Sequence, residues 1–191
     1  MRGAAPRIPK GSGRALKKHE AHPYTVMTVC TGNICRSPMG EIILRHEFEQ
    51  RGLGGVVRVE SSGVSDEEYG NPIDPRAVKV LKERGYAVPA KHFAHRITRN
   101  EITDTDLFLP MTASHMNALL HMLPLSKRGE VHMYRSFDPS LPDPQPGYEG
   151  EIDLVDPWYG GSREFETAID QIEAVAPYIA DYVEQQLEAR G

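Results

Sequence analysis

The most informative part of the chain for predicting its architecture reads Tyr24-Thr25-Val26-Met27-Thr28-Val29-Cys30-Thr31-Gly32-Asn33-Ile34-Cys35-Arg36-Ser37-Pro38. Its first six residues are rich in β-branched and apolar side chains, which predicts a short buried strand. Seven loop residues, 30–36, follow. Ser37 then suits the N-cap of a helix and Pro38 its first position, and we expect this helix to run to about Arg51. The stretch therefore predicts a strand, a loop and a helix in direct succession.

The rest of the chain alternates strand and helix patterns. We expect further strands at 56–61, 107–111 and 131–134, and helices at 74–84, from Thr112 or Ser114 to Leu123, and at 162–187. This alternation predicts an α/β fold, a single-domain three-layer sandwich with a central parallel sheet of about four strands and helices on both faces. In such a fold the ligand crevice lies at the carboxyl ends of the strands, where the first strand meets its helix.

The bulk composition sets limits on the class of protein. A chain of 191 residues with 39% hydrophobic and 26% charged residues suits one globular domain. No apolar run reaches the length of a membrane span, and the N-terminal segment lacks the apolar core of a secretory signal. The two cysteines, Cys30 and Cys35, are too few and too close to staple a fold, so we expect a reducing compartment, the cytoplasm.

Charge is distributed unevenly along the chain. Residues 1–22 carry six Lys or Arg and one Glu, a balance of +5 within a total of −5, so the remaining residues carry −10. We expect 1–22 to be a disordered basic arm and 23–191 to be the folded domain, with a weakly supported alternative role for the arm as a tether. The acidic body argues against nucleic acid as a partner, and we expect no membrane partner either.

The loop 30–36 has the properties of an anion cradle. Cys30 lies at the end of a strand and Arg36 at the start of a helix, so the backbone N–H groups between them can curl around a phosphate. Gly32 permits the tight backbone, and the Arg36 guanidinium offers a fork of donors. The same donors stabilise a thiolate, the nucleophilic form of cysteine, and Ser37 can hydrogen-bond the sulfur. The alternatives are a buried structural cysteine and a zinc site, and two cysteines at this spacing make zinc unfavourable, so we expect no metal.

A second loop offers the proton that phosphate ester cleavage requires. Asp156-Pro157-Trp158-Tyr159-Gly160 combines residues typical of loops, and Asp156 can serve there as general acid. Trp158 and Tyr159 can wall the cleft against an aryl group. The alternative is a surface Asp-Pro turn without function.

Both loops resemble known motifs. Residues 30–38 resemble the signature of the low-molecular-weight protein tyrosine phosphatases, and residues 156–160 resemble the general-acid loop of that family. Between them, residues 61–65 and 91–98 resemble the family's Ser-Ala-Gly-Thr and Ser-His-x-Ala-Arg segments. The resemblance covers roughly residues 24–190 and identifies the folded part as a phosphatase domain.

The resemblance implies a role for each matching residue. Cys30 attacks phosphorus, Asp156 protonates the leaving group and then activates water, and Ser37 stabilises the thiolate. Asn33 braces the loop through Ser61 and His92, and Cys35 is a redox partner that protects Cys30 through a reversible disulfide. The phosphate is bound by Arg36 and the backbone N–H groups of the loop, that is, by Thr31, Gly32, Asn33, Ile34, Cys35 and Arg36.

The implied activity is hydrolysis of phosphotyrosine in proteins, and of small aryl phosphates, through a cysteinyl-phosphate intermediate. Neither cofactor nor metal is required, phosphate and other oxyanions are expected inhibitors, and the chain is expected to be a monomer or a weak homodimer. Because relatives that act on phosphoarginine often have Thr at the position of Ile34, Ile34 favours phosphotyrosine.

Three alternative functions stay open at this point. Residues 111–115, Met-Thr-Ala-Ser-His, resemble the version found among arginine phosphatases, which keeps a protein-arginine phosphatase as an alternative. An arsenate reductase is less favoured, because it needs two further cysteines and none follows Cys35. A catalytically inactive phosphate-binding module is disfavoured, because the nucleophile, the arginine and the general acid are all present.

Overall fold

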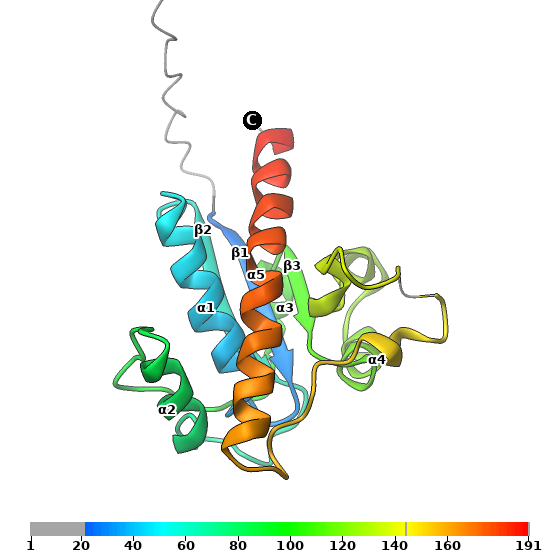
Figure 1. The fold of residues 1–191 in the computed structure, drawn as a ribbon. Helices are drawn as coiled ribbons and strands as arrows, with labels where there is room; N and C mark the ends of the chain where they lie inside the picture. Colours follow the sequence, from blue (N-terminus) through cyan, green and yellow to red (C-terminus); the bar gives the residue numbers. More distant parts are fainter. Residues whose placement is uncertain (1–21, 144, 191) are drawn as a thin grey trace, which may run out of the picture.

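The computed structural model describes residues 22–143 and 145–190, so nearly all of the basic arm expected at 1–22 lies outside the described residues. Within them the strands β1 (Tyr24–Cys30), β2 (Val57–Gly63) and β3 (Leu107–Pro110) form a parallel sheet in the order β2-β1-β3. The register pairs Cys30, the last residue of β1, with Gly63, the last residue of β2. The ends of both strands therefore meet at the lower edge of the sheet in Figure 1.

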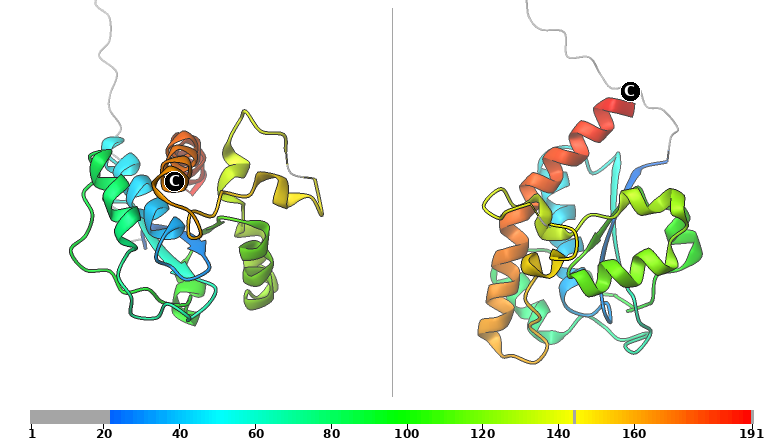
Figure 2. Two further views of the ribbon diagram at one scale, coloured as in Figure 1. Left: turned by 60° about the horizontal axis from the view of Figure 1, so that its bottom comes forward. Right: turned by 90° about the vertical axis from the view of Figure 1, so that its right-hand side faces the viewer.

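Helices cover both faces of the sheet, which confirms the predicted three layers. The helices α1 (Arg36–Gln50), α2 (Pro75–Glu83) and α5 (Ser162–Arg190) pack over one face, while α3 (Arg99–Asp104) and α4 (Ala113–Met122) lie over the other. Figure 2 shows the sheet between these two groups. Side chains of β1 alternate between the two cores, Val26 toward α1 and α5 and Met27 toward α4.

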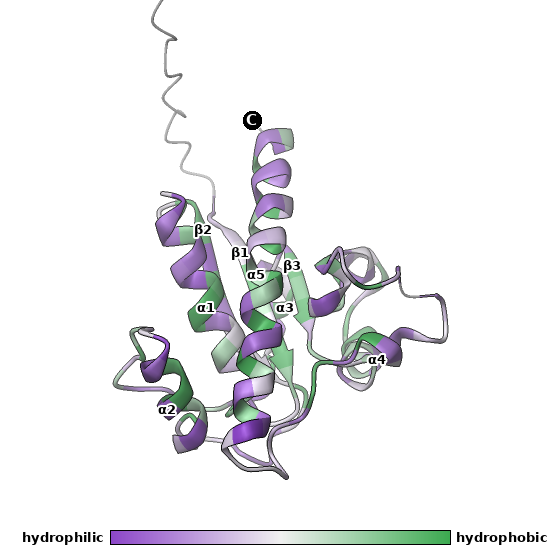
Figure 3. Ribbon diagram, viewed as in Figure 1, coloured by the Kyte–Doolittle hydropathy of each residue, from purple (hydrophilic) through white to green (hydrophobic). Residues whose placement is uncertain are grey.

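The long last helix extends beyond the sheet. Its buried residues run from Phe165 to Val183, and its final turns are hydrophilic and project past the sheet in Figure 3. None of the helices in the part of the chain that the structure describes combines the length and the apolar character needed to cross a membrane.

The predicted fourth strand, 131–134, is not formed. Val131 makes only an isolated bridge to Phe108, and the chain then turns into the 3-10 helix Tyr134–Phe137. Tyr134 is fully buried, and its hydroxyl donates to the carbonyl of Ile172 in α5. Because burial of this ring beneath α5 draws the chain away from the sheet, the described sheet has three strands.

Two helix starts differ from the prediction. Helix α1 begins at Arg36, and the residue at its N-cap position, Cys35, makes no side-chain cap. The hydroxyl of Ser37, the predicted cap, lies near the Cys30 sulfur instead. Helix α3 was not expected, and the capping box of Thr98 and Glu101 explains its start.

Of the two caps proposed for the fourth helix, Thr112 makes the contact, since its side chain accepts from the N–H of His115. Pro110, unusual within a strand, is accommodated because β3 lies at the edge of the described sheet. The next residue, Met111, directs its N–H to Val29, so the Pro110 nitrogen faces away from β1.

Candidate active site

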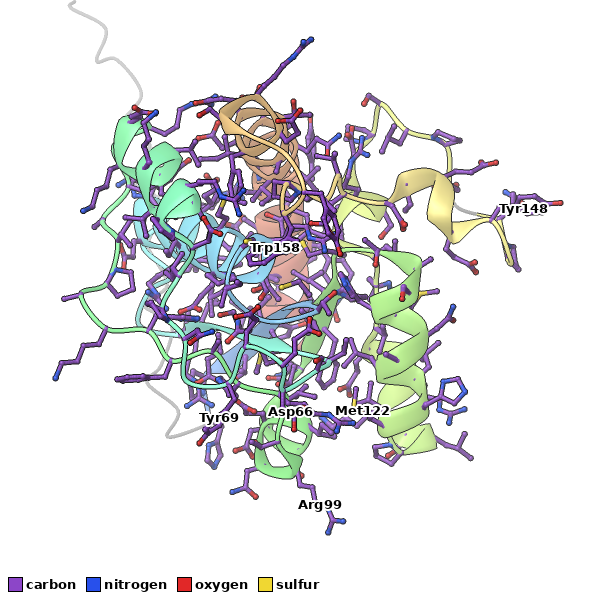
Figure 4. All side chains as sticks on the ribbon, turned by 90° about the horizontal axis from the view of Figure 1, so that it is seen from below. Asp66, Tyr69, Arg99, Met122, Tyr148 and Trp158 are labelled. Atoms are coloured by element: carbon purple, nitrogen blue, oxygen red, sulfur yellow. The ribbon has the colours of Figure 1, made fainter. Side chains whose placement is uncertain are left out.

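The loop 30–36 lies at the carboxyl ends of the strands, the face that Figure 4 presents to the viewer. The chain after β2 runs beside this loop, with Val64 N–H donating to the carbonyl of Cys30 (2.9 Å) and Ser65 N–H to that of Thr31 (3.1 Å). Gly63 permits the approach, because a Cβ at this position would lie 2.5 Å from the Thr31 carbonyl oxygen. The cradle is thus supported by main chain from a neighbouring strand.

Asn33 is the internal brace of the cradle. Its φ is 59°, a left-handed conformation that asparagine tolerates better than most residues, and it is fully buried. Its Nδ2 donates to Ser37 Oγ and to Ser61 Oγ, both at 3.0 Å. The structure thus has the expected contact with Ser61, while His92 contacts the loop through the backbone carbonyl of Asn33, 2.8 Å from His92 Nε2. His95, which the sequence analysis did not assign to the site, adds its N–H to Asn33 Oδ1 at 3.2 Å.

The Cys30 sulfur lies at the centre of this network. It is buried, and its Sγ is 3.1 Å from Ser37 Oγ. Because Asn33 Nδ2 donates to the same hydroxyl oxygen, the Ser37 hydrogen is left to donate toward the sulfur. The Ser37 hydroxyl is thus oriented toward the Cys30 sulfur.

Arg36 and Asp156 meet across the cradle, although 120 positions separate them in the chain. Arg36 is buried and donates from Nη2 to Asp156 Oδ2 at 2.8 Å and from Nη1 to the Leu154 carbonyl at 3.4 Å. The Asp156 side chain is 42% exposed, and its Oδ1 accepts from the N–H of Trp158 at 3.1 Å. A carboxyl group that solvent can reach thus lies directly beside the buried arginine of the loop.

The second cysteine has a different environment. Cys35 is buried, and burial raises the pKa of its thiol well above its usual range, with the nearby Asp74 carboxylate acting in the same direction. Its thiol is therefore protonated at neutral pH. Both cysteines are free.

The aromatic residues of the general-acid loop stand at the surface. Trp158 is 41% exposed and lies near the centre of the face in Figure 4, whereas Tyr159 is 91% exposed. Trp158 therefore already stands beside the site, while Tyr159 extends into solvent.

His115 contacts the cradle and was not assigned a role from the sequence. Its Nε2 lies 2.9 Å from Thr31 Oγ1, and its Nδ1 has no hydrogen-bond partner among the described residues. Burial, with a smaller effect from the charge of Arg36, lowers the pKa of His115 to about 3. A neutral imidazole therefore supports the first residue after the nucleophile. The only sequence signal for it was the motif at 111–115.

The chain is similar to known phosphatases over most of its length. The family model for low molecular weight phosphotyrosine protein phosphatase matches residues 25–189. The low molecular weight protein-tyrosine-phosphatase of Streptomyces coelicolor is 35% identical over 169 residues, which cover 88% of this chain and 98% of the relative. Low molecular weight protein-tyrosine phosphatase A of Mycobacterium tuberculosis is 37% identical, covering 88% and 97%. Among solved structures, the YwlE arginine phosphatase from Geobacillus stearothermophilus superposes with a TM-score of 0.69 at 28% identity, covering 87% and 97%.

Proposed function

The chain belongs to the low molecular weight phosphotyrosine protein phosphatases and is a protein-tyrosine phosphatase, and from this premise we propose that Cys30, Arg36 and Asp156 carry out its reaction. The observation that supports these roles best is the 2.8 Å contact between Arg36 and Asp156. It joins the proposed general acid to the last residue of the loop that begins with Cys30, and the Cys30 sulfur lies 3.1 Å from the Ser37 hydroxyl in the next turn of chain.

In the first step the phosphate dianion binds Arg36 and the N–H groups of residues 31–36. The Cys30 thiolate attacks phosphorus, so that an S–P bond forms while the P–O bond to tyrosine breaks. Asp156 gives its proton to the departing phenolate oxygen, which lowers the barrier for this poor leaving group.

In the second step the Asp156 carboxylate takes a proton from water as the water oxygen attacks phosphorus. The S–P bond breaks and the Cys30 thiolate leaves, stabilised by the Ser37 hydroxyl 3.1 Å away. Inorganic phosphate and the free enzyme result. The proposed steps use no metal and no organic cofactor.

We assign phosphotyrosine as the substrate, with phosphoarginine as the alternative that one structural relative supports by its printed name. Ile34 is 8% exposed within the cradle and places an apolar side chain where a hydroxyl favours phosphoarginine chemistry. Two peptides of one sequence, bearing either phosphotyrosine or phosphoarginine, test this assignment. We expect wild type to prefer phosphotyrosine in kcat/KM and Ile34→Thr to shift the ratio toward phosphoarginine. A wild-type preference for phosphoarginine overturns the assignment.

We further propose that Cys35 protects the nucleophile. If a peroxide oxidises Cys30 to the sulfenic acid, the Cys35 sulfur attacks the Cys30 sulfur, the S–OH bond breaks, and the hydroxyl leaves as water with the Cys35 proton.

Two free cysteines and a thiolate nucleophile also suit a reducing compartment, so we place the protein in the cytoplasm, as a monomer or a weak homodimer.

A further inference from the structure

One edge of the Arg76 guanidinium binds the carboxylate of Asp74. Arg76 is the second residue of α2, and Asp74 is the N-cap of that helix. Arg76 Nε donates to Asp74 Oδ1 at 3.0 Å and Nη2 donates to Oδ2 at 2.8 Å. This is the bidentate geometry that holds a guanidinium plane in one orientation. Asp74 is only 7% exposed, so the pair is shielded from solvent on the carboxylate side.

The remaining nitrogen of Arg76 holds the general-acid loop. Its Nη1 donates to the carbonyl oxygens of Gly160 at 2.9 Å and Trp158 at 3.2 Å. The guanidinium carbon also lies 5.5 Å from the centre of the Trp158 ring and 4.7 Å from that of Phe165. Arg76 therefore contacts the loop that carries Asp156 through two main-chain oxygens and the Trp158 ring, and it contacts the start of α5 through Phe165.

Both ends of this contact reach the reacting groups. Asp74 N–H donates to the carbonyl of Ile34 in the phosphate cradle at 2.8 Å. At the other end, the N–H of Trp158 donates to Asp156 Oδ1 at 3.1 Å, and the carbonyl of the same Trp158 is held by Arg76. A continuous series of hydrogen bonds thus joins the cradle to the carboxyl group opposite it.

We propose that Arg76 is a positioning residue for proton transfer, which sets the 156–160 loop at the distance from the cradle at which Asp156 reaches the leaving oxygen. The proposal rests on the general-acid role proposed for Asp156. Positioning matters here because a displacement of about 1 Å lowers a rate by up to about 100-fold. Arg76 is not part of the 30–36 loop, and its contacts to the 156–160 loop are the direct ones, so we expect its main effect on proton transfer.

The test compares substrates that differ in their need for a proton. Phenyl phosphate has a poor leaving group, whereas 2,4-dinitrophenolate leaves without protonation. For Arg76→Gln we expect kcat/KM to fall about 10- to 100-fold on phenyl phosphate and less than about 3-fold on 2,4-dinitrophenyl phosphate. Vanadate inhibition should stay within about 2-fold of wild type, which also reports an intact cradle. Arg76→Lys, which cannot bind Asp74 and both carbonyls together, should be intermediate.

Arg84 provides a matched control on the same helix. It is the C-cap residue of α2 and pairs with Glu166, Asp170 and Glu173 of α5. Arg84→Gln therefore removes ion pairs of a surface arginine without changing a contact to the general-acid loop. We expect it to change both substrates equally and slightly. If Arg76→Gln lowers both substrates equally, or resembles Arg84→Gln, the proposal is wrong.

A double-mutant cycle distinguishes the positioning role of Arg76 from the general-acid role of Asp156. In the Asp156→Ala background, Arg76→Gln should cause no further loss on phenyl phosphate, because it acts through the missing carboxyl group. A further loss of the same size contradicts positioning. If Asp156→Ala itself shows no dependence on the leaving group, the general-acid role fails. If Asp156→Ala shows it and Arg76→Gln does not, only the role of Arg76 fails.

Discussion

At the scale of single residues, the site depends on one hydroxyl group. Ser37 Oγ accepts from Asn33 Nδ2 and lies 3.1 Å from Cys30 Sγ, so the amide determines the direction in which the hydroxyl donates. Asn33 in turn is held in its left-handed conformation by Ser61, His92 and His95. A series of hydrogen bonds thus leads from these residues through Asn33 and Ser37 to the Cys30 sulfur.

The Cys30 assignment predicts a complete loss of chemistry when sulfur is replaced. Cys30→Ser should abolish hydrolysis of para-nitrophenyl phosphate, because a hydroxyl in this cradle is not ionised. Cys35→Ser should retain most activity, since its protonated thiol makes no attack in the proposed steps. Steady-state assays of both variants check this, and activity retained in Cys30→Ser contradicts the nucleophile.

At the scale of elements, the residues of the candidate site lie at the junctions between strands and helices rather than within them. Helix α1 starts without a side-chain cap, so its first N–H groups remain available to an anion. Sequence reasoning predicted a Ser37 cap, which is the ordinary use of serine before proline. The resemblance to the family implied the bond from Asn33 to Ser61, which the structure contains. The additional bond from Asn33 Nδ2 to the Ser37 hydroxyl, which occupies the predicted cap, was not implied by it.

The junction of β2 with the cradle predicts a sensitive glycine. Gly63→Ala places a methyl group 2.5 Å from the Thr31 carbonyl oxygen and 3.0 Å from that of Ser65. Because both oxygens belong to the main chain, the loop must move to relieve the contact. We expect unfolding free energy to fall by about 1–3 kcal/mol, with weaker vanadate inhibition and lower kcat/KM. Gly55→Ala is the control, since nothing lies within 4 Å of its added carbon. Wild-type vanadate inhibition in Gly63→Ala would show that the loop tolerates the contact.

At the scale of the whole molecule, helices cover both faces of the sheet, so the residues of the candidate site lie at the carboxyl ends of the strands. Segments from β1, β2, α2, α4 and the loop before α5 all reach the cradle. Several polar residues are buried where these segments meet, and their burial affects the free energy of unfolding. His115, a residue of α4 that is buried against the cradle, is the clearest case.

The lowered pKa of His115 predicts acid sensitivity of the folded state. An unfolded histidine binds a proton near pH 6.5, whereas the folded one resists protonation down to about pH 3. Stability therefore falls as pH decreases from 6.5, by about 1.4 kcal/mol per pH unit at most. Between pH 7 and 4.5, urea unfolding should show His115→Gln gaining about 2 kcal/mol relative to wild type. A difference between the two proteins that is independent of pH contradicts a neutral buried histidine.

The α/β class, the loop at 30–36 and the loop at 156–160 can be predicted from the amino-acid sequence, because each depends on local pattern and on residues adjacent in the chain. The departure of 131–134 from the sheet cannot, because burial of Tyr134 against α5 is a long-range packing effect. The contact of Asp156 with Arg36, the contacts of His115 and His95 with the 30–36 loop, and the link from Arg76 to the 156–160 loop are likewise visible only in the folded structure. Those contacts join segments that no short motif relates, and they form only when the helices pack on the sheet.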